Sequence, residues 1–143
     1  MPRRDVASIV FVIDEDAGPH VRDGICDAGG QAILLIDQIG RSVPDVDWIP
    51  RVREWGQALV TRDVSMRSVR AERDALAKSG VHVFILRCSG MKIDELRATI
   101  ARHFPKMLRC VRNQATPFLA HITAAGVEVR QTGGRPGGRR KDE

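Results

Sequence analysis

The stretch SIVFVIDED, residues 8–16, changes within one position from a continuous apolar run to three consecutive carboxylates. Four of the five residues at 9–13 are β-branched and the fifth is Phe11, a composition typical of a strand buried on both faces. Side chains alternate along a strand, so Asp14 and Asp16 share one face and Glu15 points to the other. A carboxylate at the end of a buried strand needs a partner, because an unpaired buried charge is costly. We therefore expect Asp14 and Asp16 to form a functional pair.

Similar apolar runs recur along the chain with helical segments between them. The runs at 31–37, 57–61 and 81–87 are predicted as further buried strands. Helices are predicted at 19–28, 47–55, 67–79 and 91–104, and Pro105 is expected to begin another short helix. Residues 118–130 alternate around a glycine-containing turn, which predicts a hairpin. The pattern indicates an α/β fold over residues 1–130, with three α/β/α layers, a mainly parallel central sheet and a C-terminal β-hairpin.

Composition and charge narrow the function classes. The 143 residues carry a net charge of +5, which favours a polyanionic partner, nucleic acid above all. Residues 131–143 lack apolar side chains and are predicted to be a disordered basic tail. The three cysteines are widely spaced, which fits neither a disulfide framework nor a metal motif. With no apolar run near the ~20 residues of a membrane span, we expect a cytoplasmic protein without a membrane partner.

More carboxylates cluster around the third predicted strand. Asp45 and Asp47 precede it at the start of a helix, and Asp63 follows it. Ligands of open α/β sheets bind beyond the carboxyl ends of the strands, so these residues meet Asp14 if strands one and three are neighbours. Converging carboxylates repel, and Mg²⁺ or Mn²⁺ offsets that repulsion, activates water and neutralises a phosphodiester. Structural roles remain open as well: Asp45 as a helix N-cap, Asp47 favouring the helix dipole and Asp63 starting a turn.

Three short motifs carry a family resemblance. FVIDED, PDVDWI and ALVTRDVSMR, in this order and spacing, resemble the PIN-like domain family, and especially VapC-type toxin ribonucleases with their compact stand-alone relatives. The resemblance spans roughly residues 8–104 and implies a Mg²⁺- or Mn²⁺-dependent endoribonuclease, often held inactive by a small antitoxin and often a homodimer. The family often places one more acidic residue on the helix after strand one; here Asp23 and Asp27 occupy that helix, and neither matches the placement.

The resemblance also assigns roles to individual residues. It implies catalytic metal ligands at Asp14, Asp45 and Asp63, supplementary ligands at Asp16 and Asp47, an orienting hydroxyl at Thr61, and RNA-phosphate contacts at Arg62 and Arg67.

Two other interpretations compete with the nuclease. The D-x-D of residues 14–16 is similar to haloacid-dehalogenase-type phosphatases, in which the first Asp is a nucleophile. Those enzymes have Thr or Val at the position that Gly18 occupies here. They also have a lysine late in the chain, which Lys92 matches poorly. The second alternative is a catalytically inactive PIN-like module that binds nucleic acid or a protein. RNA cleavage with and without EDTA discriminates the nuclease from this module.

Overall fold

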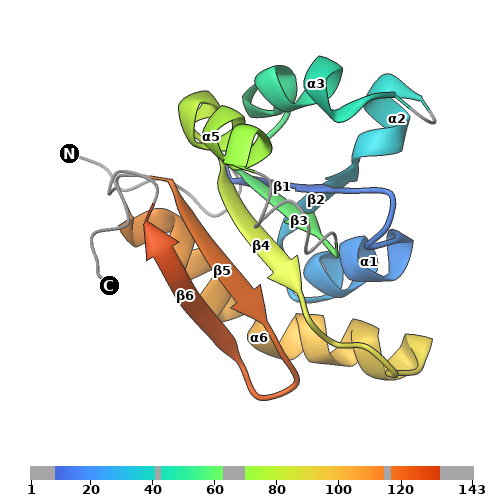
Figure 1. The fold of residues 1–143 in the computed structure, drawn as a ribbon. Coiled ribbons are helices and arrows are strands. Elements are labelled where there is room, and N and C mark those ends of the chain that lie inside the picture. Colours follow the sequence, from blue (N-terminus) through green and yellow to red (C-terminus); the bar gives the residue numbers. More distant parts are fainter. Residues whose placement is uncertain (1–8, 41–42, 63–69, 115–116, 133–143) are drawn as a thin grey trace.

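A six-stranded sheet with the order β2-β1-β3-β4-β5-β6 lies at the centre of the fold (Figure 1). The structure is a computed structural model that describes residues 9–40, 43–62, 70–114 and 117–132. Neighbouring strands from β2 to β5 are parallel, and β6 pairs antiparallel with β5. The strands are β1 (Val10–Ile13), β2 (Gln31–Leu34), β3 (Ala58–Thr61), β4 (His82–Leu86), β5 (Phe118–Ile122) and β6 (Val127–Thr132).

Helices cover both faces of the sheet. One face packs on α1 (Pro19–Asp27) and α6 (Ile93–Asn113). The other packs on α2 (Leu35–Ile39), α3 (Asp45–Trp48), the 3-10 helix η2 (Ile49–Glu54) and α5 (Arg70–Ser79). The apolar strand residues alternate between the two cores: Phe11 and Ile13 face α1 and α6, and Val12 faces the opposite layer. The three-layer α/β/α architecture expected from the sequence is confirmed.

The strand order places a topological switch point between β1 and β3. The chain crosses from β1 to β2 over the α1 face, and then returns over the opposite face to β3 on the other side of β1. Ile13 of β1 is in register with Val60 of β3, so the two strands end side by side. A crevice opens at such a point because the two flanking connections leave in opposite directions. The first and third strands are therefore neighbours, which is what the predicted meeting of the carboxylates requires.

Two predicted elements begin or end differently from expectation. The run at 31–37 is a strand only to Leu34, and α2 starts at Leu35, because a short apolar run does not by itself distinguish strand from helix. The helix predicted at 47–55 is a four-residue α-helix followed by a 3-10 helix. Pro50 has no backbone N–H to continue the α-helical ladder, which explains the change at this position.

The long helix α6 corrects a further expectation. It runs without interruption from Ile93 to Asn113, with Pro105 inside it, so no second helix begins at Pro105. At the other end of the sheet β6 continues to Thr132, two residues beyond the predicted domain boundary, and 133–143 lie outside the described residues. None of the described helices has the length and apolar content needed to cross a bilayer.

Candidate functional site

The three carboxylates of residues 14–16 occupy a tight turn at the end of β1. The Asp14 amide donates to the Val60 carbonyl at 2.9 Å, so Asp14 extends the contact between β1 and β3 by one residue. Its own carbonyl accepts the Ala17 amide at 3.0 Å and closes the turn. Gly18 then adopts φ +85°, a conformation that suits glycine, and the chain enters α1. This local geometry holds Asp14 and Asp16 at the switch point.

Thr61, the last residue of β3, joins the two carboxylates. Its hydroxyl donates to Asp14 Oδ2 at 2.9 Å and lies 3.2 Å from Asp16 Oδ1. Backbone amides complete the arrangement: Glu15 N–H donates to Asp14 Oδ1 at 2.7 Å and Arg62 N–H to Asp16 Oδ1 at 3.0 Å. Thr61 itself has no exposed surface. The structure therefore brings together Asp14, Asp16 and Thr61, and the turn after β1, rather than alternation along the strand, places Asp16 beside the Thr61 hydroxyl.

The two negative charges of this cluster favour the binding of a cation. A threonine hydroxyl has one proton, so it donates fully to only one carboxylate at a time. Both carboxylates nevertheless lie within hydrogen-bonding distance of the same oxygen, and two such charges repel. Hard divalent cations prefer oxygen ligands, and Mg²⁺ is commonly held by one or two carboxylates plus water and substrate phosphates. The donor set formed by Asp14 and Asp16 fits such an ion.

A small cavity adjoins Asp14 on the α2 and α3 side. Its volume is about 140 Å³, and it is lined by residues 14, 15, 35, 36, 39, 40, 43 and 48. Trp48 closes it from α3, the helix that Asp45 begins. The segment that carries the predicted ligands Asp45 and Asp47 therefore borders the same cavity as Asp14.

Several predicted site residues have no observed place in the cluster. Asp47 is exposed on α3, and no hydrogen bond or ion pair joins it to Asp14 or Asp16. The Asp45 side chain, Asp63 and Arg67 lie outside the described residues. Within the described ranges, no three His, Cys, Asp or Glu side chains form a metal-binding group.

The acidic residues of α1 have a structural partner. Arg97 of α6 binds Asp27 at 2.6 Å through Nε and at 2.8 Å through Nη2, and its Nη1 lies 3.9 Å from Asp23. The hydrogen bond and charge of Arg97 hold the pKa of Asp27 below its usual value. These contacts tie α1 to α6 and give both acidic residues a structural role.

A second cavity extends from the site over the ends of β3, β4 and β5. We call it the arginine pocket; its volume is about 760 Å³ and its lining includes Arg62, Arg87, Ser89, Thr123 and Arg130. Arg62 links it directly to the carboxylates, because its backbone N–H donates a hydrogen bond to Asp16 Oδ1. Arg87 and Arg130 were not among the site residues predicted from the sequence. The signal for Arg87 was available, because it follows buried β4 as Asp14 follows β1.

Comparison with known proteins identifies the domain type. The sequence model of a family described as "PIN like domain" matches residues 9–88, which is more than half of the chain. The matched segment runs from β1 through β4 and so contains Asp14, Asp16, Thr61 and Arg62. The family resemblance carried by the sequence motifs is confirmed. No curated protein and no solved structure matches the chain.

Proposed function

This chain belongs to the PIN like domain family, and on that premise we propose that it is a divalent-metal-dependent endoribonuclease, a hydrolase of RNA phosphodiester bonds. The observation that carries the proposal is the convergence of Asp14 and Asp16 on the Thr61 hydroxyl, at the point between β1 and β3 where open α/β sheets bind ligands.

Each residue of the cluster has a role in this function. Asp14 and Asp16 hold a Mg²⁺ or Mn²⁺ ion, with Asp45, Asp47 and Asp63 as the further ligands that the family resemblance implies. The ion supplies charge neutralisation at the phosphodiester and an activated water. The Thr61 hydroxyl orients both carboxylates. The backbone N–H of Glu15 fixes one oxygen of Asp14, and that of Arg62 fixes one oxygen of Asp16.

Arginines beside the carboxylates supply the phosphate contacts. Arg62 and Arg87 line the arginine pocket, and no described carboxylate pairs with either guanidinium in an ion pair. Guanidinium groups match phosphate oxygens in a bidentate geometry. We place the RNA phosphates next to the scissile bond on Arg62 and Arg87, with Arg67 as a third contact.

Family membership also favours the nuclease over the phosphatase alternative, whose case rests on the D-x-D triplet alone. The inactive PIN-like module is the other reading of the same fold. It predicts RNA or protein binding without metal-dependent cutting, which the experiment below separates from the nuclease.

The proposal extends to a biological role as the toxin of a toxin–antitoxin pair. In that role a small antitoxin protein is a partner that blocks the site, and a homodimer is the expected assembly. Induced expression of the chain should stop cell growth, and Asp14→Ala should relieve the arrest. Light scattering of the purified protein measures the homodimer directly.

The experiment is cleavage of end-labelled single-stranded RNA by the purified protein. Mg²⁺ or Mn²⁺ should support cleavage and EDTA should stop it. Asp14→Ala should reduce cleavage to background while the folded state, followed by circular dichroism, persists.

Asp94→Asn is the matched control, because Asp94 is an exposed carboxylate on α6 far along the chain from the cluster. It should cleave like the wild type. Cleavage that survives EDTA, or that Asp14→Ala retains, contradicts the proposal. RNA binding without metal-dependent cleavage supports the inactive module instead.

A further inference from the structure

The part of the chain beyond the family match carries an unusual charge pattern. From position 96 to position 127 the sequence has no Asp or Glu, although it contains four arginines and one lysine. Arg97 is paired with Asp27, whereas no described carboxylate forms an ion pair with Arg102, Lys106 or Arg109. All three are exposed on α6.

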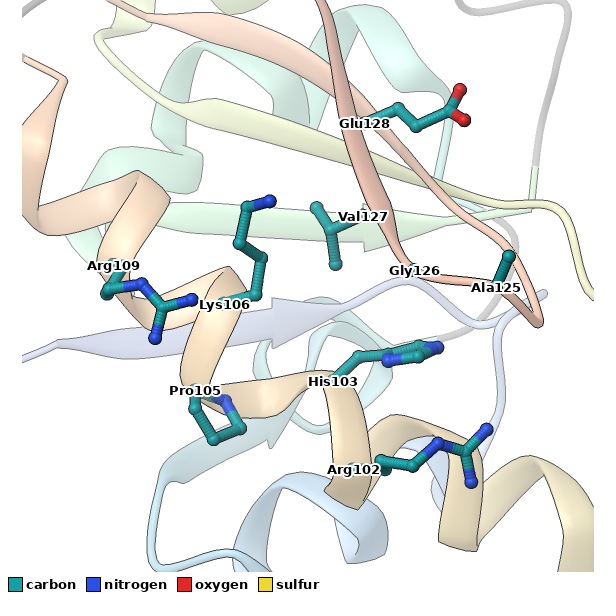
Figure 2. A pocket seen from close by; sticks show the side chains of 9 residues that line it. All are labelled: Arg102, His103, Pro105, Lys106, Arg109, Ala125, Gly126, Val127 and Glu128. Carbon is teal, nitrogen blue, oxygen red and sulfur yellow. The ribbon is translucent and has the colours of Figure 1, made fainter.

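They gather in one pocket between α6 and the β5–β6 hairpin, shown in Figure 2. This α6 pocket has a volume of about 420 Å³ and is lined by Arg102, Lys106 and Arg109 from the helix and by residues 125–128 from the hairpin. The spacing i, i+4, i+7 puts the three cations on one helix face, about 6 Å and then about 4.5 Å apart along the axis. The result is a row of positive charge along one wall of the pocket.

The hairpin holds this pocket at the edge of the sheet where the candidate site lies. The turn between β5 and β6 follows the carboxyl end of β5, which is parallel to β4 and hence to β1 and β3. His103 Nε2 lies 3.2 Å from the Ala124 carbonyl and so connects α6 to the turn. His103 is 9% exposed, which makes the contact part of the packed structure.

The α6 pocket and the arginine pocket meet at Glu128, which lines both. Glu128 is the one carboxylate in either lining, and Arg130 pairs with it at 3.1 Å. The two pockets lie on opposite sides of the edge strand β6, because Val127 packs in the core under α6 and Glu128 alternates with it, so the path of an RNA strand that leaves Asp16 past Arg62 and the arginine pocket reaches α6 around this edge. Four interstrand spacings separate β1 from β6 along this path, roughly 19 Å at about 4.8 Å each.

We propose that the α6 pocket binds backbone phosphates of the RNA strand whose scissile bond lies at Asp14 and Asp16. This inference rests on the proposed function and adds a second contact, remote from the cut. A single-stranded RNA long enough to span the path touches both pockets, and a short one touches only the first. Binding through phosphates is independent of base sequence and sensitive to salt.

The lining favours a nucleic acid over an acidic protein partner. Protein interfaces are anchored by buried aromatic and large apolar side chains. The large hydrophobic side chains exposed among the described residues are Ile93 and Val129, and neither lines this pocket. A row of cations without apolar anchors suits a polyanion of regular charge spacing.

The test compares two double variants with the same change in net charge. Lys106→Gln/Arg109→Gln removes two cations from the α6 pocket, and Arg53→Gln/Lys78→Gln removes two exposed cations from η2 and α5 on the opposite side of the sheet. Binding is measured in EDTA, where metal-dependent cleavage is stopped, with RNAs of about 4 and about 16 nucleotides. Glutamine keeps helix propensity, so both variants should melt like the wild type.

We expect the α6 variant to bind the long RNA roughly tenfold more weakly, with the slope of log affinity against log salt reduced by about 1.4. The short RNA should bind unchanged, and the control variant should bind both RNAs like the wild type. Equal losses in the two variants, or equal losses for the two lengths, overturn the inference. The inference is also overturned if polyglutamate competes for the α6 pocket as effectively as an RNA of the same charge does. The binding assay does not depend on cleavage. A lack of nuclease activity would therefore refute the proposed function, whereas only the binding results decide this inference.

Discussion

Thr61 is the residue on which the site geometry depends. It is fully buried at the end of β3, and its single hydroxyl lies between two carboxylates from the end of β1. A buried hydroxyl is held in one orientation by its surroundings, so it can position both carboxylates before any ligand arrives. The cluster is therefore organised by the junction of two parallel strands.

Thr61→Val tests this positioning role. Valine keeps the shape of the side chain but removes the hydroxyl, which leaves Asp14 and Asp16 without their shared donor. We expect RNA cleavage to fall by about 10- to 100-fold, with a higher metal concentration required for half-maximal rate. The measurement is the initial cleavage rate across a Mg²⁺ titration.

Thr61→Ser is the control for that variant. It restores the hydroxyl and removes only a methyl group, so the metal concentration at half-maximal rate should return towards the wild-type value. An equal shift in both variants would mean that packing of the methyl group, and not the hydroxyl, sets the response.

The proximity of Asp14 and Asp16 was expected from the sequence, but the structure gives it a different physical cause. Strand alternation pairs the two residues only if β1 continues past Asp14, whereas β1 ends at Ile13 and a turn brings Asp16 to the Thr61 hydroxyl. Arg87 and Arg130 could not be placed from the local sequence, because their proximity to Arg62 depends on the order of the strands in the sheet. Strand order is set by the whole set of packed helices, which no local pattern encodes.

At the scale of elements, α1 and α6 pack closely against each other. Gly24 of α1 lies against α6 so closely that a Cβ there would meet the Arg97 carbonyl oxygen at 2.6 Å and Ile100 Cβ at 2.9 Å. Contacts this short require one helix to move. The glycine therefore permits the helices to approach each other, at a cost in helix propensity.

Gly24→Ala should destabilise the protein despite the better helix propensity of alanine. Alanine gains up to about 1 kcal/mol in a helix, whereas overpacking typically costs about 1–3 kcal/mol. We expect a net loss of about 1–2 kcal/mol in the free energy of unfolding, measured by urea denaturation. An increase in stability would show that the two helices separate freely.

The Asp27–Arg97 pair gives the same contact a dependence on pH. Arg97 lowers the pKa of Asp27, so the ionised form is favoured in the folded protein. A lowered pKa adds stability above the unfolded-state value of about 3.9, and this stability is lost as the pH falls through the folded-state pKa. Asp27→Asn should therefore melt below the wild type at neutral pH, and the two melting curves should converge in acid. A gap that persists in acid would assign the effect to another cause.

The continuity of α6 shows why element boundaries were harder to predict than element types. An internal proline costs a helix about 3 kcal/mol, which favoured a break at Pro105. Pro105 is on the exposed side, and the buried stripe continues from Phe104 before it to Met107, Leu108 and Val111 after it. Burying each such side chain contributes about 1.5–3 kcal/mol, so packing outweighs the proline.

At the scale of the whole molecule, burial separates the three cysteines into two groups. Cys26 is exposed, because its neighbour Ile25 takes the buried position on α1. Cys88 and Cys110 are buried, and burial raises the pKa of both thiols. The thiolate is the reactive form, so both should be slow to react.

Alkylation of the native protein should therefore modify Cys26 first. Cys88 and Cys110 should react only after urea exposes them and returns their pKa values to the ordinary range. Mass spectrometry of the digested protein identifies the modified residues. Rapid reaction of Cys88 or Cys110 without denaturant would contradict the two-core packing described here.

The architecture was predictable because the strands β1 to β4 are each marked by a separate apolar run, and β5 and β6 by alternation around a glycine-containing turn. Strands buried on both faces have a continuous apolar sequence, and the helices between them require a parallel, three-layer arrangement. The position of β1 between β2 and β3 was a condition in the sequence reasoning and is an observation in the structure. The side chains of Asp45, Asp63 and Arg67 lie outside the described residues, so their roles stay predictions.

If the carboxylates that meet at Thr61 bind a hard divalent cation, electron paramagnetic resonance of added Mn²⁺ should detect it. We expect saturable Mn²⁺ binding by the wild type, displaced by Mg²⁺, and its loss in both Asp14→Asn and Asp16→Asn, with Asp94→Asn unchanged. Absence of saturable binding in the wild type, or binding that both aspartate variants retain, would contradict metal binding at this site.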